Sequence, residues 1–271
     1  MTCPTRNRSR LLVSSASSAM ALALVLAVPQ RADAQAINAS GTVVQGTAGI
    51  DDTVAGETTI SVFGRTAVID WAPAEDNNGD ALDFLPTNTT AFFLAGDSNP
   101  DFAVLNRILP STNGNVVVMD GTVISRIFDQ SGNAVPGGFV AFYSPTGILI
   151  GSNATFDVGS LLLTTLEPDL ASFQNFVENN GTLALAAAPG STARIQIDSG
   201  AQIIASPENA FFSVVAADVQ MSGSSIVNGS QAYVAGEVVN LRFSNGLFDI
   251  EIPTGTAASG TVLQLDGSVS G

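Results

Sequence analysis

The sequence predicts an all-β protein whose short strands stack in parallel as the coils of a solenoid. Val, Ile, Phe, Thr and Gly are abundant while Lys is absent, a composition typical of short strands joined by turns. From Ile37 onward we find no convincing helical period, and most apolar segments have the length of a strand. In the second half, Gly-led segments recur at irregular intervals of roughly 19–20 residues, or half that when each strand is counted, a spacing that indicates stacked coils.

The first 34 residues have a different pattern from the rest of the chain. Arg6, Arg8 and Arg10 precede the apolar run AMALALVLAVP at 19–29, and ADA at 32–34 or AQA at 34–36 supplies small residues suited to cleavage. The run is shorter than the ~20 residues that a transmembrane helix needs. We therefore predict a cleavable secretory signal peptide over 1–34, and a secreted or cell-surface protein; a buried helix is the alternative.

Charge excludes two classes of partner. The chain has 271 residues and a formal net charge of −15, and its nine basic residues are all Arg. Residues 1–34 hold four of these Arg and one acid, which leaves five Arg, 23 acids and a net charge near −18. So acidic a chain offers no basic surface to nucleic acid or to an anionic membrane.

Strand-length segments follow the signal peptide in order, and Gly, Asn, Ser, Asp or Pro separates most of them. They lie at 42–45, 58–63, 66–71, 91–96, 115–121, 123–128, 138–143, 147–151, 154–165, 181–187, 193–200, 201–206, 211–223, 224–229, 232–244 and 247–252. The segment LASFQNFVEN at 170–179 spaces its apolar residues by three and four and predicts one short helix.

The recurring segments are NNGTLALAA, DSGAQIIAS, MSGSSIVNG and VAGEVVNLRFSNG. Each places Gly before a short apolar strand, and we expect each to lie on a coil of one stack of about ten coils. A β-sandwich is the alternative, but it would show more two-residue Asn-Gly or Asp-Gly loops between alternating strands.

Catalytic and metal-binding chemistry has little support in the sequence. There is no His, and the only cysteine, Cys3, lies in the signal peptide. A Ser/His pair, a thiol nucleophile and a disulfide are thereby excluded from the mature chain. EDNNGD at 75–80 resembles a calcium loop, but its Gly falls one place early and the twelfth position is Thr87. We expect a solvated loop there, and neither a metal nor a cofactor.

Four segments in this order resemble a known family. They are RTAVIDW at 65–71, AVLNRI at 103–108, GGFVAFYSPTGILIGSNATFDVGSLLLTT at 137–165 and AYVAGEVVNLRFS at 232–244. They are similar to the N-terminal secretion (haemagglutination activity) domain of the filamentous haemagglutinin family, the exoproteins of two-partner secretion systems. The resemblance covers about residues 37–252.

The resemblance implies a right-handed parallel β-helix with extra-helical strands and an N-terminal cap. It also implies a secretion module that an outer-membrane β-barrel transporter of a Gram-negative bacterium recognises in the periplasm. The larger exoprotein, often an adhesin, then follows it out and can meet receptors on host or neighbouring cells. A carbohydrate-active β-helix enzyme and a structural surface or biofilm component are the alternatives.

Six residues are the candidate site that the resemblance implies: Asn106, Arg107, Ser144, Pro145, Thr146 and Gly147. For Arg107 the alternative is an ion pair with a nearby acid such as Asp101 or Asp129, and for Asn106 a role as a turn or ladder-capping residue. Where the family commonly has Asn-Pro-Asn-Gly, this chain has Ser-Pro-Thr-Gly at 144–147. We expect a type I turn, because Thr146 is β-branched and avoids the positive φ of type II.

The domain boundaries follow from these observations. We expect the secretion domain over 35–252, after the signal peptide at 1–34. Residues 253–271 contain GTVLQLDGSVSG, which reads as the start of a further coil or of a truncated continuation.

Overall fold

A computed structural model describes residues 1–2, 35–73, 81–96, 101–244 and 246–271. The chain divides into two units, Met1–Ala32 and Asp33–Gly271, and every helix and strand described below belongs to the second. Apart from its first two residues, the expected signal peptide lies outside the described residues, and so does the whole EDNNGD loop at 75–80.

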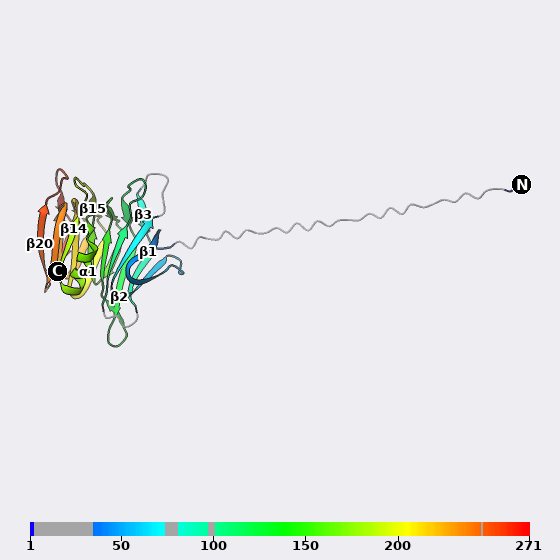
Figure 1. Cartoon of the computed structure of the whole chain (residues 1–271), viewed down its shortest axis with the longest axis horizontal. Coiled ribbons are helices and arrows are strands. Elements are labelled where there is room, and N and C mark those ends of the chain that lie inside the picture. Colours follow the sequence, from blue (N-terminus) through cyan, green and yellow to red (C-terminus); the bar gives the residue numbers. More distant parts are fainter. Residues whose placement is uncertain (3–34, 74–80, 97–100, 245) are drawn as a thin grey trace. The chain divides into compact units, whose positions relative to one another are not determined.

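The second unit is a parallel β-helix, and its first face is a row of parallel strands (Figure 1). In order of pairing, this face contains the first half of β2 (Glu57–Pro73), β4 (Thr90–Ala95), β7 (Thr122–Phe128), β11 (Thr155–Val158), the first parts of β16 (Gln202–Ala216) and β18 (Ser224–Ala235), and β22 (Ser268–Ser270).

The second face uses the other halves of the long strands. It contains the second half of β2, then β5 (Ala103–Ile108), β9 (Phe139–Tyr143), β12 (Ser160–Thr164) and the second parts of β16 and β18. The third face contains β3 (Leu82–Leu85), β6 (Val117–Met119), β10 (Ile148–Ile150), β15 (Arg194–Ile197), β17 (Asp218–Met221) and β21 (Leu263–Leu265).

The third face gives the number of coils. It is a six-stranded sheet, so six coils are complete within the described residues. The expectation of about ten coils was too high, because it counted strands that lie outside the stack. Residues 253–271 add β21 and β22, which pair in parallel with β17 and β18.

The N-terminal segment covers the open end of the first coil. Ala36 and Ile37 are buried; the Ile37 N–H donates to Thr58 Oγ1 at 3.2 Å and the Asn38 N–H donates to Phe84 O at 2.9 Å. From there β1 (Ala39–Asp51) runs antiparallel along both halves of β2. The expected N-terminal cap is therefore present, and it closes the hydrophobic interior at this end.

The interior of the coils is apolar and contains a ladder of aromatic rings. Phe142 meets Phe93 at 5.9 Å and Phe156 at 6.3 Å between ring centroids, both edge to face. These rings come from three successive coils, on β4, β9 and β11. Edge-to-face contacts of this kind add to the free energy gained by burial alone, and they tie the coils together.

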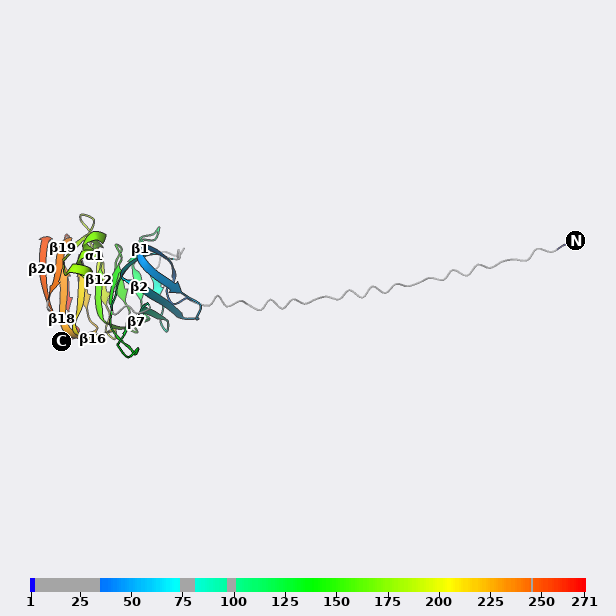
Figure 2. The same cartoon turned by 60° about the horizontal axis from the view of Figure 1, so that its bottom comes forward.

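An extra layer covers the outer side of the second face (Figure 2). It consists of α1 (Leu170–Asn179) and an antiparallel sheet of β13 (Glu167–Pro168), β14 (Thr182–Ala186), β19 (Val238–Ser244) and β20 (Leu247–Thr254). A separate short strand, β8 (Ala134–Pro136), makes a hairpin with β7.

This layer explains the apolar runs at 137–165. All five residues of β9 are buried, with Phe142 facing the interior while Phe139 and Ala141 pack against the extra layer. A strand buried on both sides reads as a continuous apolar run rather than as an alternation.

Two of the four recurring segments lie outside the stack. DSGAQIIAS and MSGSSIVNG place β16 and β18 on coils, as expected. NNGTLALAA and VAGEVVNLRFSNG instead form β14 and β19, which pair antiparallel in the extra layer. The expectation that all four form coils was therefore wrong, because a short apolar strand bounded by Gly looks the same in either setting.

The expected helix is present at 170–179. Asp169 caps it by accepting a hydrogen bond from the Ser172 N–H at 2.7 Å, and Asn180 ends it in the left-handed conformation with φ 52°. The fold class is confirmed: an all-β, right-handed parallel β-helix with extra-helical strands and an N-terminal cap. No helix in the described part of the chain is long and apolar enough to span a membrane.

Candidate functional site

The structure brings the two expected motifs together. β5 pairs with β9 so that Asn106 lies opposite Phe142 and Arg107 lies opposite Tyr143. Ser144, the first residue of the turn, follows Tyr143 directly. The two motifs are far apart in sequence, yet they lie on neighbouring coils at one end of the second face.

Asn106 points into the interior and is fully buried. Its Oδ1 accepts a hydrogen bond from Trp71 Nε1 at 3.0 Å, and its Nδ2 donates to Ala141 O at 3.1 Å. These bonds join β5 to β2 on one side and to β9 on the other, as a residue within the strand ladder would. In the folded chain, the Asn106 side chain has no surface to offer a partner.

Arg107 points outward and is partly exposed. Its Nε lies 3.2 Å from Asp70 Oδ1 and its Nη2 lies 3.7 Å from Glu167 Oε1. An ion pair is present, but the expected partners Asp101 and Asp129 were wrong. The register places Arg107 opposite Asp70 on β2, whereas Asp129 forms hydrogen bonds within its own hairpin loop.

Tyr143 stands beside this ion pair. Burial raises the pKa of Tyr143 to about 12; the Glu167 carboxylate adds to the increase and the Arg107 guanidinium opposes it. The hydroxyl is therefore protonated at neutral pH and is available as a hydrogen-bond donor. The outer side of this end of the second face thus carries a phenol, a guanidinium and two carboxylates.

The Ser144–Gly147 turn joins three coils. Its closing bond runs from the Gly147 N–H to Ser144 O at 3.4 Å, the Ser144 N–H donates to Thr164 O at 3.1 Å, and Gly147 O accepts from the Val117 N–H at 3.1 Å. Apart from glycines, the described residues with positive φ are three Asn and no Thr. Thr146 therefore does not adopt positive φ, as expected.

Gly147 is required by geometry. Its φ is 112°, and a Cβ there would lie 2.9 Å from Arg194 O of the next coil. Ser144 is buried, and its hydroxyl lies 3.0 Å from the Thr146 hydroxyl rather than on the backbone. Pro145 and Thr146 are therefore the only residues of this turn with side chains at the surface.

Two open hollows flank Glu167. One, of about 570 Å³, is lined by Arg107, Glu167 and residues of β14; the other, of about 400 Å³, is lined by Tyr143, Pro145 and Glu167, among others. The exposed parts of the expected site therefore lie along one continuous rim, where the β-helix meets the extra layer.

Sequence reasoning missed four residues of this site: Trp71, Asp70, Tyr143 and Glu167. The first two belong to the IDW segment and Tyr143 precedes the turn, so their closeness to the motifs in sequence was a usable signal. Glu167 had none, because only the fold of the extra layer brings it to Arg107. Within the described residues, no group of three or more His, Cys, Asp or Glu side chains could hold a metal ion.

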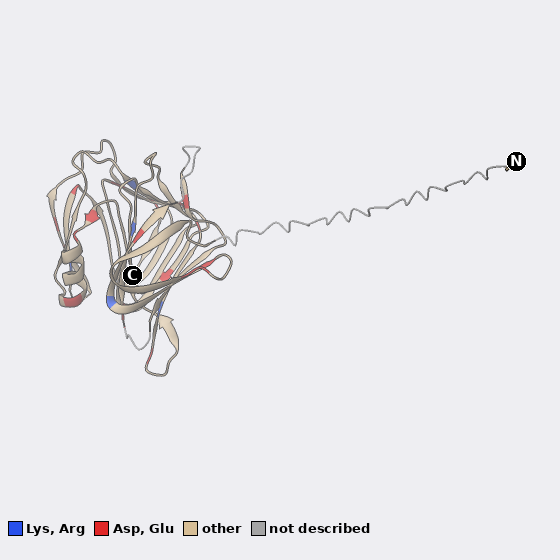
Figure 3. Cartoon of the chain, turned by 45° about the vertical axis from the view of Figure 1, so that its right-hand side comes forward, with Lys and Arg blue, Asp and Glu red and all other residues tan. Residues whose placement is uncertain are grey.

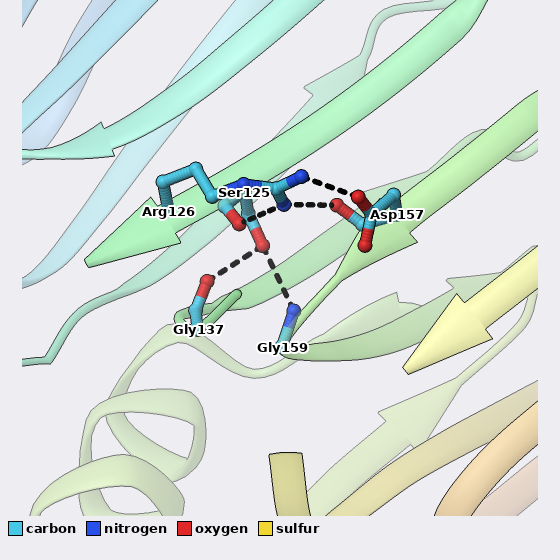
Figure 4. Close-up of polar contacts among 5 residues, drawn as sticks. All are labelled: Ser125, Arg126, Gly137, Asp157 and Gly159. Carbon is cyan, nitrogen blue, oxygen red and sulfur yellow. Dashed lines mark hydrogen bonds and ion pairs between the residues drawn. The ribbon is translucent and has the colours of Figure 1, made fainter. Parts of the chain in front are cut away.

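A second ion pair provides a reference on the first face. Arg126 bonds the Asp157 carboxylate of the next coil and the carbonyls of Ser125 and Asp157 (Figure 4). The Arg126 side chain is 21% exposed and that of Arg107 is 19% exposed. The two arginines thus have like exposure, and each pairs with at least one carboxylate, but they lie on different faces.

Comparison with solved structures identifies the fold. Over 81% of this chain, the structure is similar to the secretion domain of HMW1 from Haemophilus influenzae, with a TM-score of 0.57 and 21% sequence identity. The chain has the fold of that secretion domain. It spans about half of that structure's length, 49%. The resemblance found in the sequence is thus confirmed at the level of the fold.

A second similarity is to the secretion domain of filamentous hemagglutinin, with a TM-score of 0.48 and 16% identity over 83% of this chain and 73% of that one. Neither a protein-family model nor a curated protein sequence matches the chain.

Proposed function

We propose that this chain is the secretion and recognition module of a two-partner exoprotein of the adhesin type. One observation carries the proposal: the fold is that of the HMW1 secretion domain over four fifths of the chain. The signal-peptide pattern at 1–34 supports export, and the absence of cysteine beyond Cys3 supports passage as an unfolded chain. The module acts as a binding domain and not as an enzyme.

The partner is an outer-membrane β-barrel transporter that reads the rim formed by Arg107, Tyr143, Pro145 and Glu167. These side chains are exposed or border the two hollows, and they come from separate coils and from the extra layer. Asn106, Ser144 and Gly147 then act indirectly, by holding the strands and the turn in place.

The transporter reads the rim on locally folded strands in the periplasm, and folding of the coils outside the cell then supplies direction to the transfer. Each coil packs on the coil before it, so a chain that emerges from the transporter can fold progressively. Burial of the interior rings then hinders return of the chain through the membrane.

A secretion assay tests the function. The full chain is expressed with and without a candidate transporter, and the amount in the medium is measured. We expect transporter-dependent release. Equal release without the transporter would contradict the proposal and favour a structural surface component. Turnover of a polyuronide that is lost when one Asp is changed would favour the carbohydrate-active enzyme instead.

Two arginine variants test the recognition rim. Arg107→Ala removes a rim cation, whereas Arg126→Ala removes a cation of like exposure from the first face. We expect Arg107→Ala to lower secretion severalfold and Arg126→Ala to leave it unchanged, with both variants folded by circular dichroism. Parental secretion of Arg107→Ala would remove Arg107 from the recognition surface.

A further inference from the structure

A cavity lies at the corner between the first and second faces, at the opposite end of the second-face strands from the recognition rim. The fourth coil turns this corner with Gly159 alone, between β11 and β12. The third coil has the hairpin of β7 and β8 at the same corner, and the pairing of β16 with β18 is interrupted between Ala205 and Ala210. The corner of the fourth coil is thus shorter than those of the coils on either side, and an open cavity of about 420 Å³ lies there.

The base of this cavity is preformed. The Ser125 hydroxyl donates to Gly137 O at 2.6 Å and accepts from the Gly159 N–H at 2.9 Å, which fixes the corner (Figure 4). A Cβ at Gly159 would lie 2.3 Å from Gly138 O, so a longer side chain cannot fill the space. A fixed, unfilled corner lowers the cost of ordering the site when a ligand binds.

Phenyl rings from four elements line one side of the cavity: Phe139 of β9, Phe176 of α1, Phe211 of β16 and Phe243 of β19. Phe211 is central, with its ring centroid 4.9 Å from that of Phe139 and 4.7 Å from that of Phe243. An aromatic wall attracts cations, since the face of each ring carries partial negative charge.

The charged side chains of the cavity would also attract a cation. Among the described residues, Asp101 and Glu208 line the cavity with one cation, Arg65, which already donates to Val177 O at 3.5 Å. Burial raises the pKa of Asp101. The Phe102 N–H, Arg65 and the Gly138 N–H oppose this increase and lower the pKa. With two carboxylates against one guanidinium, the cavity carries excess negative charge, on a chain in which basic residues are few (Figure 3).

We propose that this corner cavity binds a small organic cation, with an alkylated ammonium group against the aromatic wall and the Asp101 and Glu208 carboxylates at its mouth. A volume of about 420 Å³ is in the range of small-molecule sites. An anionic ligand is disfavoured, because it would meet both carboxylates. The site needs no transporter, and so it is independent of the function proposed above.

Titration of the full chain with choline, followed by calorimetry, tests this site. The comparison ligand is the uncharged isostere of choline, in which carbon replaces the ammonium nitrogen. Both have the same shape, so the difference reports the charge. We expect choline to bind roughly tenfold more tightly than the isostere. Equal affinity for the two, or no binding of choline, would overturn the proposal.

Variants locate the site on the molecule. Asp101→Asn with Glu208→Gln keeps the shape and removes the charge, and we expect a roughly tenfold loss of choline affinity. Glu251→Gln, on exposed β20, is the matched control and should bind like the parent. Phe243→Leu reduces the aromatic wall at a partly buried position and should also weaken binding. Parental affinity in the charge variant would refute the site, whether or not Phe243→Leu folds.

Discussion

The first and second faces of the β-helix belong to the same coils but bury their strands differently. On the first face, β4 alternates between buried and partly exposed residues, so one side meets solvent. On the second face, β9 is buried throughout because α1 and the antiparallel sheet cover its outer side. Among the segments that carry the family resemblance, β9 and β12 are thus held between two apolar layers, which is why they contain so little reactive chemistry.

The largest expected difference concerns outward side chains on the two faces. Leu162 of β12 is 1% exposed beneath the extra layer, whereas Ile124 of β7 is only partly buried. Leu162→Ala should lower the free energy of unfolding by about 2–5 kcal/mol, and Ile124→Ala by about 1 kcal/mol. Denaturant unfolding measures both. Equal losses would mean that the extra layer does not pack stably on the second face.

The hydrogen bonds of the buried Asn106 side chain should give the next largest effect on stability. Asn106→Ala leaves the Trp71 N–H and the Ala141 carbonyl without partners in the interior. We expect the free energy of unfolding to fall by about 2–4 kcal/mol. Asn133→Ala, in an exposed hairpin turn, is the control and should change it by less than about 0.5 kcal/mol. A similar small change in both variants would contradict the ladder role of Asn106.

The titration of Tyr143 probes the cover over the second face. The pKa is raised above that of an unfolded Tyr, so this group's contribution to stability is present below pH 10 and is lost as the pH rises toward about 12. The chain has two Tyr, so Tyr233→Phe isolates Tyr143 in an absorbance titration of tyrosinate. In that background, Glu167→Gln should lower the pKa of Tyr143, because Glu167 helps to raise it. An unchanged midpoint would place Glu167 away from the ring.

The smallest stability effect should come from the two arginine ion pairs. Both arginine side chains are partly exposed, and solvent screens ion pairs that it reaches. Arg107→Ala and Arg126→Ala should each lower the free energy of unfolding by about 1 kcal/mol or less, on either face. A much larger loss for Arg107→Ala would show that its secretion phenotype arises from misfolding.

Much of the candidate site could be predicted from sequence, but not its geometry. The Ser144–Gly147 turn and the VLNR segment were visible as motifs, and the absence of a positive φ at Thr146 followed from its branched side chain. The partners of Arg107 could not be predicted, since Asp70 and Glu167 reach it through strand register and through the extra layer. The inward direction of Asn106 depended on the same register.

The sequence alone determined most of the strands, the turns and the helix at 170–179, because these depend on local periodicity and on the backbone preferences of single residues. β3, β5 and β8 were not among the predicted strands. Only the tertiary structure decided which strands stack. β11 pairs with β16, although α1 and β14 lie between them in the sequence. β14 lies outside the coils and pairs with β19. A strand of a given apolar pattern fits either setting, and burial against partners distant in sequence determines which one it joins.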